Sequence, residues 1–131
     1  MLREIAIEME IVGKGRPKFA YGHTYNPKKT SDAEKTIRSH WINEYGKNPT
    51  DKPVNLRVMT FRPIPKSRPK RITSEPDTYT PDADNILKLV ADALNKVAYL
   101  DDRQIVYASV HKCDRRRSDH EIISIAVEER I

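Results

Sequence analysis

The sequence has little cysteine, little glycine and no long apolar run. Its single cysteine, Cys113, excludes an intramolecular disulfide and a zinc site built from several cysteines. No stretch approaches the roughly 18 consecutive apolar residues that span a bilayer. The first residues, Met1 to Glu4, mix charged with apolar side chains and do not form the apolar core of a signal peptide. We therefore expect a cytoplasmic protein with no membrane partner.

The sequence is instead rich in charged residues, which make up 33% of the chain. The chain has 131 residues, with 24 lysines and arginines against 19 aspartates and glutamates, and 37% of its residues are hydrophobic. This length suits a single domain covering residues 1–131. The net charge of +5 is modest, but charges of each sign are gathered into separate blocks, so the average hides an acidic centre between basic loops.

Alternation of apolar and polar residues predicts four strands. They lie at about residues 3–11, 54–59, 104–112 and 121–128. The second strand is expected to pair with the first. The glycine-containing stretch at 13–22 follows the first strand, and the proline-rich stretch at 62–81 follows the second. Both are predicted to be long loops.

Two helices are predicted from helical spacing of apolar residues. The first covers residues 32–45, because Ser31 and Glu34 have the spacing of a capping box and Gly46 follows. The second is predicted to begin after Asn85 and carries a wide apolar stripe. The expected fold class is α/β, of the α+β kind: a small mixed sheet of about four strands with two main helices packed on it.

A cluster of acidic residues surrounds the second helix. Five aspartates fall within 21 positions, namely Asp82, Asp84, Asp92, Asp101 and Asp102. Pro81 keeps its neighbours extended, so the side chains of Asp82 and Asp84 point to the same side and can share a metal ion. Carboxylate oxygens suit Mg²⁺ or Mn²⁺, which activate water for phosphodiester hydrolysis. Alternatively, Asp84 caps the helix, and Asp101 with Asp102 forms a tight turn.

Lys88 lies one helical turn after Asp84. There it can offset the repulsion between carboxylates and donate a charged hydrogen bond to a phosphate during reaction. The alternative is a solvated helix face on which Lys88 pairs with Asp92, four residues on.

Basic residues flank the acidic cluster on both sides in the sequence. Their natural partner is the phosphate backbone of a nucleic acid, although any one block can equally be a solubilising surface. The basic residues of these blocks are Arg16, Lys18, Lys28, Lys29, Arg62, Lys66, Arg68, Lys70, Arg71, Arg115, Arg116 and Arg117.

Three short motifs resemble the RusA family of Holliday-junction resolvases (crossover junction endodeoxyribonucleases). TPDADNILK at 80–88, DALN at 92–95 and YLDDRQI at 99–105 occur in the family's order, and Lys112 follows where the family has a basic residue in the next strand. GRPK at 15–18 looks like the family's N-terminal basic motif. The strong part of the resemblance covers residues 81–112.

The resemblance implies a small homodimeric endonuclease with a RusA-like fold, of a family often encoded by prophages. Such enzymes bind four-way DNA junctions and nick opposing strands with Mg²⁺ or Mn²⁺, in recombination and repair. It implies that Asp82, Asp84 and Asp102 are metal ligands, that Asp101 is a fourth acidic contributor and that Lys88 is the catalytic lysine. The basic residues expected to contact DNA are Arg16, Lys18, Lys66, Arg68, Lys70, Arg71 and Lys112.

Two other functions stay open at this point. The first is a non-catalytic module that binds branched DNA or RNA, in which the aspartates cap the helix and fill turns. The second is a nuclease for linear or single-stranded nucleic acid. Divalent-ion dependence separates the first from a resolvase, and comparison of junction, flap and linear substrates separates the second.

Overall fold

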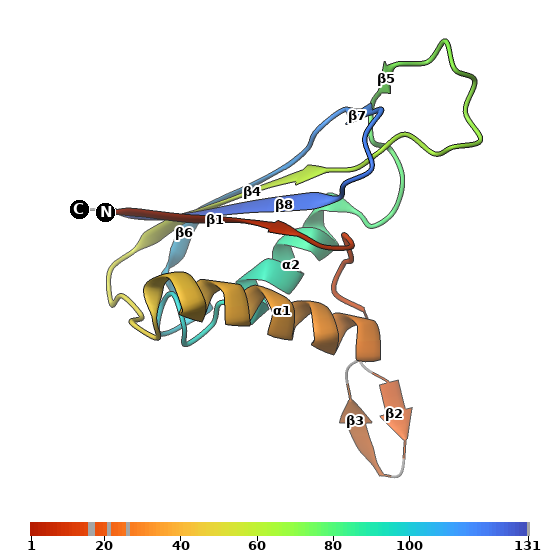
Figure 1. The fold of residues 1–131 in the computed structure, drawn as a ribbon. Coiled ribbons are helices and arrows are strands. Elements are labelled where there is room, and N and C mark those ends of the chain that lie inside the picture. Colours follow the sequence, from red (N-terminus) through yellow and green to blue (C-terminus); the bar gives the residue numbers. More distant parts are fainter. Residues whose placement is uncertain (16–17, 21, 26, 131) are drawn as a thin grey trace.

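The computed structural model describes residues 1–15, 18–20, 22–25 and 27–130 (Figure 1). Its centre is a four-stranded sheet in the order β1-β8-β4-β6. The four strands are β1 (Leu2–Glu8), β4 (Val54–Phe61), β6 (Ile105–Lys112) and β8 (Ile122–Glu129). β1 and β4 both pair antiparallel with β8, and β4 pairs parallel with β6. The predicted small mixed sheet is confirmed.

The predicted pairing of the first two strands was wrong, because the last strand, β8, lies between β1 and β4. Alternation shows which side chains of a strand face the core, but it does not identify the neighbouring strand. β8 buries Ile123, Ile125 and Val127 on one face. With strands on both sides, it occupies an inner position of the sheet.

Helices α1 (Lys28–Tyr45) and α2 (Ala83–Ala93) cover the same face of the sheet (Figure 1). α1 begins directly after Pro27, with no side-chain cap, so the predicted capping box was wrong. Proline suits a helix start because its fixed φ is compatible with the first turn. Gly46 ends the helix as predicted, with a φ of 72° and its N–H donating to the carbonyl of Ile42 at 2.7 Å.

α2 begins three residues earlier than predicted. Asp82 is still extended, with a ψ of 153°, and the helix starts at Ala83. The apolar stripe is confirmed, since Ile86, Leu89 and Val90 are buried. The helix ends at Ala93, and Lys96 in the following turn has a φ of 70°.

The core lies between the two helices and the inner face of the sheet. Ile37 and Trp41 of α1, Leu89 of α2, and Leu56 and Ile125 of the sheet are almost fully buried. Burial of each such side chain contributes about 1.5–3 kcal/mol. The α2 stripe therefore fixes the helix firmly against the sheet, and the residues at its two ends are carried on a rigid element.

The remaining elements are short. They are the hairpin of β2 (Lys18–Ala20) and β3 (His23–Tyr25), the paired strands β5 (Ser74–Glu75) and β7 (Arg115–Arg116), and the 3-10 helix η1 (Asp102–Gln104). Both predicted long loops therefore contain some strand structure. Among the described residues, no helix is long and apolar enough to cross a membrane.

Candidate functional site

The start of α2 carries the first pair of predicted aspartates. Asp82 occupies the N-cap position, and its carbonyl accepts the N–H of Ile86 at 3.1 Å, but its side chain makes no capping hydrogen bond. Asp84 lies in the first turn, where Oδ1 accepts the N–H of Asn85 at 3.0 Å. Both side chains are exposed. The alternative that Asp84 is the N-cap residue was therefore wrong, because Asp84 lies inside the first turn, where its carboxylate accepts one N–H and the helix dipole favours negative charge.

Lys88 is exposed one turn further along α2. The alternative pairing with Asp92 was wrong: Asp92 Oδ2 lies 3.1 Å from the Nζ of Lys14, which also lies 2.7 Å from Glu34 Oε1. Burial opposes the charge on Lys14, but these two carboxylates outweigh it and raise the pKa of its ammonium group. Within the described ranges, Lys88 forms no ion pair.

The second pair of aspartates lies in the turn between α2 and β6. Asp101 caps η1: its Oδ1 accepts the N–H of Arg103 at 2.9 Å, and its own N–H donates to Gln104 Oε1 at 2.8 Å. The hydrogen bond from Arg103 is the main reason that the pKa of Asp101 lies below its usual value. The turn explanation thus holds for Asp101. Asp102 is exposed in the first position of η1.

The two pairs lie at opposite ends of α2. The helix has 11 residues, which at about 1.5 Å per residue makes it roughly 16 Å long. β6 runs back alongside α2, and the ammonium of Lys112 at its far end donates to the carbonyl of Tyr79, three residues before Asp82. One chain therefore does not bring Asp102 to Asp82. Consistent with this, no group of three or more acidic, histidine or cysteine side chains in the described part of the chain can hold a metal ion.

The donor chemistry at the start of α2 nevertheless fits a hard divalent cation. Mg²⁺ is commonly bound through one or two carboxylates together with water and substrate phosphates. Asp82 and Asp84 offer two exposed carboxylates on a rigid helix end. They would hold the ion together with ligands from nucleic acid or from a second chain.

The family model described as endodeoxyribonuclease RusA matches residues 8–128. The chain belongs to the RusA endodeoxyribonuclease family. It is also 41% identical over 68 residues to the protein YqaN of Bacillus subtilis (strain 168), which is described as uncharacterized. That match covers 46% of this chain and 48% of YqaN, so the chain spans about half the length of this curated relative.

The basic residues of this RusA-family chain differ in their contacts with other side chains. Lys66, Lys70 and Arg71 are exposed in the loop between β4 and β5. The guanidinium of Arg68 donates to Glu75 Oε2 at 2.8 and 3.1 Å, which ties this loop to β5. Arg16 and the side chain of Lys18 lie outside the described residues. DNA contact by all seven predicted residues stays a prediction.

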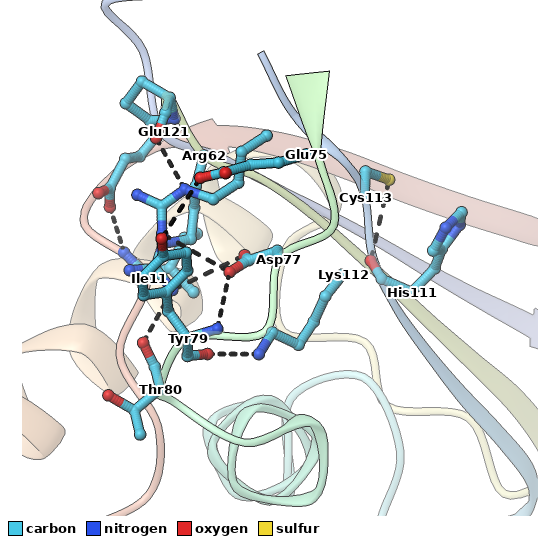
Figure 2. Close-up of polar contacts among 12 residues, drawn as sticks. Ile11, Arg62, Glu75, Asp77, Tyr79, Thr80, His111, Lys112, Cys113 and Glu121 are labelled. Carbon is cyan, nitrogen blue, oxygen red and sulfur yellow. Dashed lines mark hydrogen bonds and ion pairs between the residues drawn. The ribbon is translucent and has the colours of Figure 1, made fainter. Parts of the chain in front are cut away.

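Sequence reasoning missed Asp77, whose side chain is fully buried in the segment that leads into α2 (Figure 2). Arg62 NH1 lies 3.7 Å from its Oδ2, and Arg115 NH1 lies 3.6 Å from its Oδ1. The available signal was composition: Asp77 and Glu75 are the only acidic residues in a strongly basic loop. An acidic residue in such a loop is more often paired with a neighbour than exposed alone.

Proposed function

We propose that the protein is a divalent-metal-dependent endonuclease that nicks branched DNA, with the four-way junction as substrate, in recombination and repair. The observation that carries this proposal is the start of α2. There Asp82, Asp84 and Lys88 are exposed at the start of one rigid helix, the Asp82 side chain makes no capping hydrogen bond, and none of the three forms an ion pair within the described residues. Membership of the RusA family supports the same chemistry.

Each side chain has a specific task in this proposal. Asp82 and Asp84 would hold Mg²⁺, or alternatively Mn²⁺, through their carboxylate oxygens. The bound ion supplies activation of a water molecule and neutralisation of charge at the leaving oxygen. Lys88 donates a charged hydrogen bond to a phosphate oxygen, where negative charge grows in the transition state.

A homodimer would complete the site. β6 is one of the two edge strands of the sheet, and its residues Val106 and Tyr107 are 55% and 51% exposed. An exposed apolar edge of this kind is suited to pairing with another strand. Antiparallel pairing of β6 with β6 of a second copy would bring the start of one strand beside the end of the other.

The consequence concerns the two pairs of aspartates. Asp101 and Asp102 precede the start of β6, whereas Lys112 at its end contacts the segment before Asp82. In the paired dimer, Asp102 of one copy would therefore approach Asp82 and Asp84 of the other. Two such sites, related by the twofold axis, suit a substrate that needs two matched nicks.

Cleavage of a synthetic four-way junction tests the proposal. Wild-type protein should nick the junction in Mg²⁺ and stop when the ion is chelated, and Asp82→Asn should lower the rate by about 100-fold or more. Glu44→Gln is the matched control, because Glu44 is an exposed carboxylate on α1, on a different element from either pair of aspartates. Absence of cleavage by wild type, or undiminished cleavage by Asp82→Asn, contradicts the proposal.

The same substrates distinguish the alternative functions. A non-catalytic module that binds branched DNA or RNA would bind the junction equally well without divalent ions and after loss of Asp84 or Asp102. A nuclease for linear or single-stranded nucleic acid would cut a linear duplex or a single strand as fast as a junction or flap. A resolvase should cut the junction fastest.

A further inference from the structure

Asp77 is a buried carboxylate held by positive charges from two distant parts of the chain. Its side chain has 0% exposure, Arg62 approaches it from the end of β4, and Arg115 approaches it from β7. Oδ1 also lies 3.4 Å from the N–H of Tyr79, whereas Oδ2 has no hydrogen-bond partner among the described atoms. Removal of this charge would leave two guanidinium groups in a largely buried site without their counterion.

The same two arginines also donate hydrogen bonds to backbone carbonyls near Asp77. Arg62 donates to the carbonyl of Thr80 at 2.8 Å. Arg115 donates through Nε to the carbonyl of Pro63 at 2.8 Å, and its guanidinium lies 4.5 Å from the centre of the Tyr79 ring. Figure 2 shows Lys112 reaching the carbonyl of Tyr79 from β6.

The segment held in this way leads directly to the candidate metal ligands. Residues 76–82 contain no helix or strand, so their path depends on these side-chain contacts. The carbonyls that accept these hydrogen bonds belong to Tyr79 and Thr80, which lie three and two residues before Asp82. Because groups that bind a metal must be held to within about 0.5 Å, a small shift of this segment would misplace the Asp82 carboxylate.

We propose that Asp77 is a positioning residue of the metal site: through Arg62 and Arg115 it fixes the segment 76–81, and thereby the orientation of Asp82 and Asp84. This rests on the proposed function. Asp77 does not itself bind the ion. Its loss should weaken metal binding more than DNA binding, because the exposed basic residues of the loop stay in place.

Asp77→Asn tests this role, since it removes the charge and keeps the shape. Binding of Mn²⁺ to the DNA-free protein, followed by electron paramagnetic resonance, should weaken by about tenfold, as for other groups that orient metal ligands. The Mg²⁺ concentration for half-maximal junction cleavage should rise in parallel, with the rate restored at high Mg²⁺ and KM for the junction unchanged. Asp114→Asn, at an exposed aspartate before β7, should match wild type.

A second variant keeps the test decisive if Asp77→Asn does not fold. Arg62→Lys keeps a positive charge near Asp77 but loses the guanidinium group that also donates to the carbonyl of Thr80. It should weaken Mn²⁺ binding, as Asp77→Asn does. Unchanged Mn²⁺ affinity in a folded variant, or a loss of rate that extra Mg²⁺ does not restore, overturns the inference. If wild type neither binds Mn²⁺ nor cleaves junctions, the proposed function itself has failed.

Discussion

Two inactive variants should restore activity when they are mixed. Asp82 and Asp102 lie at opposite ends of α2, separated by a helix of 11 residues and roughly 16 Å. We propose that each site takes Asp82 from one copy and Asp102 from the other. Neither the Asp82→Asn homodimer nor the Asp102→Asn homodimer then contains a complete site. A heterodimer of the two variants contains one intact site and one site that lacks both carboxylates.

The size of the recovery follows from counting sites. Random exchange in an equal mixture gives heterodimers in about half of all dimers, and each has one intact site of two, so about one quarter of the wild-type sites return. The nature of the product should change as well. A heterodimer cuts only one of two opposing strands, so nicked junctions should accumulate and resolved duplexes should be rare.

The assay is junction cleavage after the two purified variants have exchanged subunits, with each variant alone as the reference. A mixture of Asp82→Asn with Asp84→Asn is the matched control, because both changes fall in the same half of the site and no heterodimer contains a complete one. Recovery confined to the first mixture supports a shared site. The reasoning is refuted if the first mixture stays as inactive as its components although an affinity tag on one variant co-purifies the untagged other variant, which shows that heterodimers have formed.

Three further predictions concern single side chains. Lys88→Met should lower the cleavage rate by about 100-fold with little change in junction affinity, and Lys88→Arg should retain more activity, as single-turnover and binding measurements can show. Glu8 raises the pKa of His120 through a side-chain hydrogen bond of 2.6 Å. The stabilisation by this pair is therefore complete below the ordinary pKa of 6.5 and is lost as the pH rises through the raised value, so the Tm of wild type should fall more over that range than the Tm of Glu8→Gln. Leu89→Ala should cost about 2–5 kcal/mol in the free energy of unfolding measured with urea, because Leu89 is 1% exposed; a cost below 1 kcal/mol would contradict the described packing.

The sequence predicted the local features of this fold well. Helix α2 has a stripe with a period of 3.6 residues, and Gly46 adopts the positive φ that only glycine takes easily. Both signals depend on residues a few positions apart. The start of α2 was placed late because Asn85 is itself a good capping residue, and only the backbone angles of Asp82 distinguish the two choices.

Features that depend on distant residues were not predictable. The insertion of β8 between β1 and β4 depends on which apolar faces fit together, and one sequence does not contain this information. Asp92 pairs with Lys14, 78 positions away, rather than with Lys88 on the same helix. The candidate site shows the same division: the pattern at 80–88 predicts that Asp82, Asp84 and Lys88 belong to one site, but it does not predict the distance that separates them from Asp102.

The position of the basic loop bears on how such enzymes diversify. The loop from Arg62 to Glu75 lies within the connection from β4 to α2, outside the sheet. Arg68 joins Glu75 and thereby closes the stretch between them, and Arg115 of β7 holds the start of the loop at Pro63. Lengthening a surface loop whose ends are already joined adds little entropic cost. Insertions and substitutions between Arg68 and Glu75 can therefore accumulate without disturbing the carboxylates at the start of α2. The exposed basic residues Lys70 and Arg71 can thus change independently of Asp82 and Asp84.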